Sequence, residues 1–262
     1  MRDARKAAGL TGERLAARCG ISQSKISKIE TGKVVASIAD VERILTALGA
    51  RQEVTDELLA LARLANTEFH NVRSSLKRGL HQKQRELAAL EADAMHVRFF
   101  LPTMITGLLQ TPEYARASLG VFSGDHAQAV AKRLDRQAQL YNPAKRFTFI
   151  LTEAAVRWQL VEAPIMAVQL GRLASLSELS NIRLGVIPLE TCVPDGPLNT
   201  FTVYDERIAT AETFGGVIMM RDPRDVAYHL ELFAFFEQYA IFDDEVRKLL
   251  EQCAGQFRRL SL

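Results

Sequence analysis

The chain has 262 residues, which is long enough for a small domain followed by a larger one. Its hydrophobic content of 48% and charged content of 24% are typical of a soluble globular protein, and no apolar run approaches the roughly 18 residues of a membrane span. The three cysteines are far apart and form no C-x-x-C pair, which argues against a disulfide framework or a zinc site. We therefore expect a cytoplasmic protein with no membrane contact, no bound metal and no cofactor.

The charge is distributed unevenly along the chain. Residues 1–50 contain nine basic and five acidic residues, a net charge of +4, so the remaining residues carry −2 of the total charge of +2. A basic N-terminal part followed by a mildly acidic remainder is typical of a nucleic-acid-binding module joined to a domain that does not bind nucleic acid.

Residues 12–32 show the pattern of two helices joined by a glycine turn. The first helix is expected over Glu13–Arg18, with Leu15 pointing inward. Gly20 supplies the turn, because glycine adopts a left-handed backbone without steric cost. Ser22 is placed to cap the second helix by accepting a hydrogen bond from a free backbone N–H. The inner stripe of the second helix consists of Ile21, Ile26 and Ile29.

The outward positions of this second helix are polar or basic, of the kind that contacts base edges and phosphates. The candidate DNA-binding residues are Ser22, Gln23, Ser24, Lys25, Ser27, Lys28 and Lys33. The alternative to a DNA-binding motif is a pair of ordinary helices joined by a glycine turn. The order in which small residues, glycine and isoleucine occur along the stretch disfavours that alternative.

This stretch resembles the helix-turn-helix of the Cro and phage-repressor type, the xenobiotic-response-element family. The matching segments are Leu10–Ala16, Gly20–Ser22, Ser22–Lys33 and the helix expected over Ser37–Leu48. The resemblance implies that Gln23, Ser24 and Lys28 face bases and that Ser22, Lys25 and Lys33 lie against phosphates. The family usually has glutamine at the position of Gly12, where it holds the DNA backbone, so this chain needs another anchor.

Three further helices are expected to complete a five-helix DNA-binding domain over residues 1–66. A short first helix covers Arg2–Ala8. Ser37–Asp40 has the cap signature that opens a helix reaching Leu48, and Thr55–Glu57 begins the last helix.

Residues 67–98 are assigned to a connecting segment. Within residues 70–98, apolar positions recur at spacings of three, four and seven, which predicts one amphipathic helix that is also a candidate dimer contact. Its basic cluster is interpreted as a solvated helix face in preference to a DNA contact.

Residues 99–262 are expected to form an α+β domain, a small mixed or antiparallel sheet covered by helices. Strands are predicted over Phe147–Leu151, Ile182–Ile187, Asn199–Tyr204 and Ile208–Phe214, the last two as a hairpin. Helices are predicted from Thr111 to Gly120, Asp125 to Tyr141, near Glu153, from Pro164, from Asp222 and over Asp243–Phe257.

Five sequence blocks in this second domain extend the resemblance over nearly the whole chain. They are GLLQTPEYARA (107–117), RLDRQ (133–137), LTEAAVRWQL (151–160), QLGRL (169–173) and NIRLGVIPLE (181–190). In this order they resemble actinobacterial regulators that couple such a helix-turn-helix to a domain of unknown function, described as WhiJ-like or antitoxin-like. That resemblance implies a transcription factor, often encoded beside a small acidic partner protein.

No motif for catalysis is present, since the chain lacks G-x-S-x-G, Walker, G-x-G-x-x-G and H-E-x-x-H sequences. Glu153 and Glu212 have no third catalytic partner, and the five histidines are isolated. Trp158 with neighbouring aromatic residues is interpreted as core in preference to an effector pocket. We therefore expect a protein that is not an enzyme, with no catalytic residues.

The leading hypothesis is a sequence-specific regulator that binds double-stranded DNA as a homodimer, with a C-terminal domain that binds a partner or effector. The first alternative is an antitoxin-like interaction protein whose C-terminal domain binds a small neighbouring-gene protein, with DNA binding serving autoregulation. The second is a regulator that senses an unknown small molecule.

Overall fold

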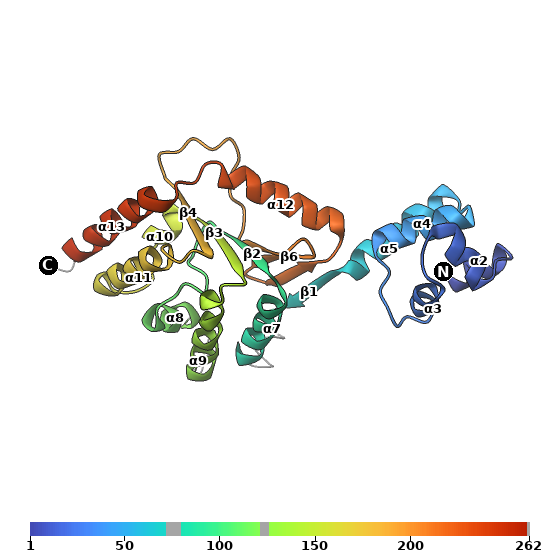
Figure 1. The fold of residues 1–262 in the computed structure, drawn as a ribbon, viewed down its shortest axis with the longest axis horizontal. Helices are drawn as coiled ribbons and strands as arrows, with labels where there is room; N and C mark the ends of the chain where they lie inside the picture. Colours follow the sequence, from blue (N-terminus) through green and yellow to red (C-terminus); the bar gives the residue numbers. More distant parts are fainter. Residues whose placement is uncertain (72–79, 121–125, 261–262) are drawn as a thin grey trace. The chain divides into compact units, whose positions relative to one another are not determined.

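The computed structural model describes residues 1–71, 80–120 and 126–260 (Figure 1). The chain divides into two compact units. The N-terminal unit contains residues 1–68 together with residues 220–222, and the C-terminal unit contains residues 69–219 and 223–262.

The N-terminal unit is built from five helices, as the sequence predicted. They are α1 (Arg2–Ala7), α2 (Gly12–Cys19), α3 (Gln23–Glu30), α4 (Ile38–Leu48) and α5 (Gln52–Asn66). Side chains at the predicted caps fix where the helices begin: Ser22 accepts from the backbone N–H of Lys25, and Ser37 and Asp40 form a capping box at α4. Glycines in the left-handed conformation end α2 and α4, with φ of 62° at both Gly20 and Gly49.

The predicted start of the fifth helix at Thr55 is wrong by three residues, since α5 begins at Gln52. The Thr55 hydroxyl does not cap the helix; it donates to the carbonyl of Arg51 one turn earlier, 3.1 Å away. Threonine makes both kinds of hydrogen bond, so its presence near a boundary does not fix the boundary.

The core of the C-terminal unit is a mixed sheet of seven strands in the order β1-β7-β6-β5-β2-β3-β4. The strands are β1 (Thr67–Asn71), β2 (His96–Leu101), β3 (Arg146–Thr152), β4 (Ile182–Ile187), β5 (Phe201–Tyr204), β6 (Ile208–Thr213) and β7 (Gly216–Met220). Strands β2, β3 and β4 run parallel, whereas β5 pairs antiparallel with both β2 and β6. The predicted strands at β3 and β4 and the predicted β5–β6 hairpin are confirmed.

Helices cover both faces of this sheet (Figure 1). They are α7 (Leu80–Asp93), α8 (Pro112–Leu119), α9 (Ala127–Arg136) with the 3₁₀ turn Gln137–Tyr141, α10 (Glu153–Arg157), α11 (Ala163–Leu176), α12 (Pro223–Glu237) and α13 (Asp243–Arg259). Phe99 and Phe149, from neighbouring strands, belong to the main core cluster that α11 and α13 close. Phe100 points to the other face, where it stacks on Phe236 of α12 with ring centroids 4.3 Å apart. The α+β architecture is therefore confirmed.

The single amphipathic helix predicted over residues 70–98 is wrong. Its first part contains the end of strand β1, its last part is strand β2, and only α7 between them is helical; residues 72–79 lie outside the described residues. The physical reason is that His96–Leu101 pairs with strands on both sides, so the apolar side chain of Val97 belongs to a sheet face although its spacing fits a helix.

Helix α7 also buries polar side chains instead of the expected apolar stripe. Gln84 and Glu91 are both buried, whereas Leu90 is only partly buried. Arg136 of α9 donates through Nε to Glu91 at 2.9 Å and also binds Gln84. Lys145 donates to three carbonyls at the end of α7, those of residues 91, 92 and 94, at 2.6–2.7 Å. Charged hydrogen bonds therefore dock α7 against the rest of the unit.

We predict that Arg136→Leu strongly destabilises the C-terminal unit, by about 3–5 kcal/mol, because it leaves the carboxylate of Glu91 buried without its partner. The free energy of unfolding is measured by urea denaturation followed by circular dichroism. The control is Arg116→Leu, which removes an exposed pair with Glu113 at 3.7 Å and is expected to cost less than about 1 kcal/mol. Equal losses in the two variants would contradict the structural role of the buried pair.

Candidate nucleic-acid interface

The turn between α2 and α3 is fixed by packing on both sides of Gly20. The side chains that pack together here are Leu15, Ala16, Cys19, Ile21, Ile26 and Ile44. Ile26 is 2% exposed, and it belongs to the inner stripe that the sequence predicted for α3. Cys19 packs as a small side chain whose Sγ lies 2.8 Å from the carbonyl oxygen of Leu15. Burying these residues fixes which side of α3 points outward.

All seven predicted DNA-binding side chains are exposed in the structure. Six lie at the N-cap or on the outward side of α3, and the seventh, Lys33, follows the turn after it. The exposed residues are Ser22, Gln23, Ser24, Lys25, Ser27, Lys28 and Lys33. The structure therefore brings them together on one helix and the turn that follows. Which of them face bases and which face phosphates stays a prediction.

An ion pair between α1 and α3 holds α3 at its C-terminal end. Arg5 donates to Glu30 twice, at 2.7 Å through Nε and at 2.9 Å through Nη2, and to the carbonyl of Leu10 at 2.8 Å. The hydrogen bonds from Arg5 lower the pKa of the Glu30 carboxyl below its ordinary value. This two-bond geometry is the strong form of a guanidinium–carboxylate contact. The local sequence does not indicate this pair, because its members are 25 residues apart.

A second ion pair joins α3 to α4, and it involves a predicted DNA contact. The Nζ of Lys25 lies 2.8 Å from the carboxylate of Asp40, which is itself 2% exposed. Burial alone would raise the pKa of Asp40, but hydrogen bonds from Lys25 and Ser37 outweigh burial and hold the pKa below its ordinary value. Lys25, predicted as a phosphate contact, therefore also has a structural partner within the protein.

Gly12, for which the resemblance seen in the sequence implies a glutamine, is the first residue of α2. A Cβ at this position would lie 3.8 Å from Nε2 of Gln23. The side chain of Gln23 thus lies beside the start of α2, next to the place that a larger residue at position 12 would occupy. An amide from α3 takes up space that glycine leaves open.

Titratable side chains of the C-terminal unit that the sequence singled out have ordinary partners among the described residues. Glu153 binds Arg157 at 2.6 Å and the backbone N–H of Leu189 at 2.9 Å, an arrangement that does not include Glu212. His96 bonds the Thr148 hydroxyl at 2.9 Å, and burial followed by nearby arginines lowers its pKa to about 4. No group of three or more metal-ligating side chains occurs in the described ranges.

The sequence blocks that looked most specific hold a loop between β2 and α8. Gln137 donates through Nε2 to the carbonyls of Gly107 at 2.9 Å and Gln110 at 2.8 Å. Gln169 accepts from the N–H of Thr111 at 2.7 Å and donates to the carbonyl of Leu109 at 2.9 Å. Buried amides from two other blocks therefore satisfy the backbone of residues 107–111, which gives Gln137 and Gln169 a structural role.

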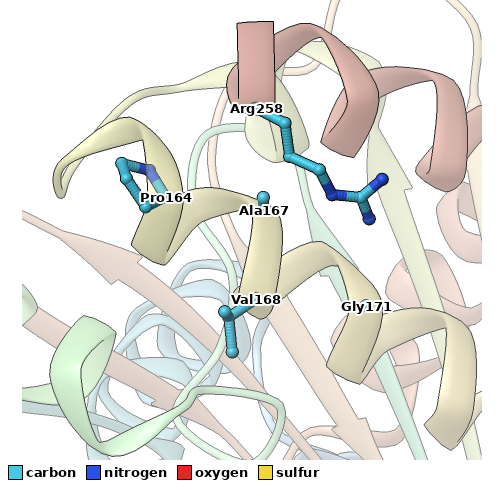
Figure 2. A pocket seen from close by; sticks show the side chains of 5 residues that line it. All are labelled: Pro164, Ala167, Val168, Gly171 and Arg258. Atoms are coloured by element: carbon cyan, nitrogen blue, oxygen red, sulfur yellow. The ribbon is translucent and has the colours of Figure 1, made fainter. Parts of the chain in front are cut away.

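One shallow hollow lies between α11 and α13 (Figure 2). Its volume is about 390 Å³, and its lining is mostly apolar. The lining residues are Pro164, Ala167, Val168, Gly171 and Arg258. Figure 2 shows that the first four lie along α11 and that Arg258 reaches in from α13. The guanidinium of Arg258 is paired with Glu251 at 2.8 Å.

In the part of the chain that the structure describes, no helix combines the length and the apolar character needed to cross a membrane. No curated protein matches the sequence.

Solved structures resemble the chain only distantly. Nuc from Salmonella typhimurium, a phospholipase D family member, shares 8% identity over 68% of this chain and 97% of its own, with a TM-score of 0.40. NucT from Helicobacter pylori shares 7% identity over 68% of this chain and 98% of its own, with a TM-score of 0.42. TrmBL2, an archaeal chromatin protein, shares 13% identity over 84% of this chain and 70% of its own, with a TM-score of 0.34. TM-scores this low carry no argument about fold or function.

Two protein families match the sequence, and they correspond to the two parts of the molecule. Residues 1–58 match the family described as a helix-turn-helix domain, and these residues include the turn at Gly20 and the outward face of α3. Residues 84–252, more than half of the chain, match the family described as a domain of unknown function (DUF5753). The chain therefore belongs to the DUF5753 family and carries a helix-turn-helix domain at its N-terminus.

Proposed function

We propose that the protein is a transcriptional regulator that binds double-stranded DNA in a sequence-specific manner through α3. The observation that carries this proposal is the division of α3 into two sides. Ile26 is buried in the helix-turn-helix core, whereas the six polar or basic residues at its N-cap and on its outward side are exposed. An exposed polar face on the second helix of this motif is what enters the major groove in helix-turn-helix proteins.

The electrostatics of the N-terminal residues support a phosphate partner. Residues 1–50 carry a net charge of +4, and three of the outward residues are lysines. Lys28 and Lys33 form no ion pair among the described residues, so their charges are available to phosphates. Gln23 offers both a donor and an acceptor, the combination that reads adenine in the major groove.

The finer parts of this proposal come from the sequence. A homodimer on a two-fold symmetric operator would place half-sites about 34 Å apart along the DNA. The C-terminal unit would bind a partner protein or an effector, as in the WhiJ-like and antitoxin-like regulators that the chain resembles. The proposal includes a cytoplasmic location and assigns no catalytic step to either unit. Selection of binding sites from random duplex DNA by the full chain tests the central claim.

We predict that Gln23→Ala and Lys33→Ala affect DNA binding in different ways. Gln23→Ala removes a base contact and is expected to relax preference at one position of the selected site by about 1–3 kcal/mol. Lys33→Ala removes a phosphate contact and is expected to weaken binding to all sequences alike, with the slope of log affinity against log salt reduced by about 1. Both are measured by titration of selected and scrambled duplexes at several salt concentrations.

Lys248→Ala is the control for Lys33→Ala, because it changes the net charge equally at an exposed position in the C-terminal unit. It is expected to leave the salt slope unchanged. If Gln23→Ala and Lys33→Ala reduced affinity for all duplexes to the same extent, the assignment of bases to Gln23 would be wrong.

We predict that Lys25→Ala, unlike Lys28→Ala, lowers the stability of the N-terminal unit by about 1–2 kcal/mol, because it leaves the buried Asp40 carboxylate short of a partner. Asp40 has a lowered pKa in the folded state, so the stability that its ionised form contributes is present above its ordinary pKa of 3.8 and is lost as the pH falls through the folded value. The difference between Lys25→Ala and the wild type should therefore be largest at neutral pH and shrink below 3.8.

Thermal unfolding of the full chain between pH 2 and pH 7 measures this effect. Lys28→Ala is the matched control on the same helix, because its side chain is exposed and has no ion pair among the described residues. Identical unfolding curves for the two variants would show that the Lys25–Asp40 pair does not hold α3 in place.

A further inference from the structure

Two arginines in the C-terminal unit are held by neutral side chains instead of carboxylates. Arg133 on α9 donates through Nη1 to Oε1 of Gln110 at 2.7 Å and to the hydroxyl of Ser118 at 2.6 Å. Arg172 on α11 donates through Nη2 to Oε1 of Gln137 at 2.6 Å. Among the described residues, neither guanidinium forms an ion pair, and the buried Nε of each lacks a hydrogen-bond partner.

The same network holds both side chains in place. Gln137 accepts from Arg172 and donates to the carbonyls of Gly107 and Gln110, and Gln110 accepts in turn from Arg133. Gly107 also shapes the site, since a Cβ there would lie 3.0 Å from Cδ of Arg133. The stem of Arg133 therefore packs against a glycine that a larger residue could not replace without moving it.

The charge of Arg133 is not neutralised locally. Burial, followed by the repulsion of Arg136, lowers its pKa to about 10, and Glu212 of β6 is the carboxylate whose charge opposes this effect. Glu212 is exposed and does not pair with Arg133. Arg136, one turn further along α9, is neutralised in the usual way, since its guanidinium is paired with the buried carboxylate of Glu91. A half-buried cation without such a partner is costly unless an anion completes it.

We propose that Arg133 and Arg172 form a binding site for an oxyanion, the phosphate or carboxylate group of a small ligand. A guanidinium presents five N–H donors in a planar fork that fits the oxygens of either group. Arg133 uses one nitrogen for its two neutral acceptors and Arg172 uses one for its single acceptor, so donors remain on both side chains. The buried glutamines and Gly107 fix the stems of the arginines before the ligand arrives.

This inference rests on the proposed function only in regarding the ligand as an effector of a regulator. Anion binding is measured without DNA, so its failure is distinguishable from a failure of DNA binding. The probes are inorganic phosphate and succinate, titrated separately into the full chain by isothermal titration calorimetry, with chloride holding the ionic strength constant. Saturable binding of phosphate alone identifies a phosphate group, and binding of succinate alone identifies a carboxylate.

The wild type is expected to bind at least one probe saturably, and Arg133→Gln and Arg172→Gln are each expected to raise its Kd at least tenfold. Arg116→Gln is the control, because Arg116 is exposed on α8 and pairs with Glu113. Circular dichroism checks that each variant is folded. If Arg133→Gln does not fold, Arg172→Lys serves in its place, since it keeps the charge but loses the planar fork and should also weaken binding. No saturable binding by the wild type, or unchanged affinity in folded variants, would overturn the proposal.

Discussion

The burial of Ile26 is the constraint on which the candidate interface depends. An isolated helix of eight residues is too short to be stable in water, so α3 exists only because its apolar side packs against α2 and α4. Once Ile26 points inward, the 3.6-residue period places Ser24 and Lys28, two residues before and after it, on the opposite side of the helix, where both are exposed. The ion pairs made by Glu30 with α1 and by Lys25 with α4 connect α3 to two further helices. Apolar packing therefore determines which side of α3 is exposed, and the two ion pairs add contacts that favour the same orientation.

Local signals made the helix-turn-helix predictable from the sequence. Gly20, Ser22 and Ser37 act within one helical turn of their own position, so their roles follow from neighbouring residues alone, and the structure confirms them. The exposed residues of the candidate site follow from the same periodicity. The pair of Arg5 and Glu30 could not be predicted, because nothing in the surroundings of either residue indicates a partner 25 positions away. The same holds for the contact between Lys25 and Asp40.

Periodicity misled the prediction where polar residues are buried. In α7, the buried positions include Gln84 and Glu91, which a search for apolar stripes treats as solvent-facing. The start of strand β2 has the apolar spacing of a helix, and strand β7 is not among the predicted strands. Both strands depend on pairing with neighbours that are distant in the sequence. Strands β3 and β4 were predictable because their apolar runs are bounded by a helix start at Glu153 and by Pro188.

Residues within one sequence block can serve different purposes. In the block that contains Arg133, Arg136 and Gln137, the structure explains Arg136 by its pair with Glu91 and Gln137 by the loop that it holds. These two contacts are complete in the folded protein, so stability is sufficient reason for both residues. Arg133 differs, because its cation is half-buried against neutral groups and gains less from folding than a paired arginine does. A bound anion would supply the counterion that Arg133 lacks in the folded protein. This is the reason that the proposed ligand site includes Arg133 and not Arg136 or Gln137.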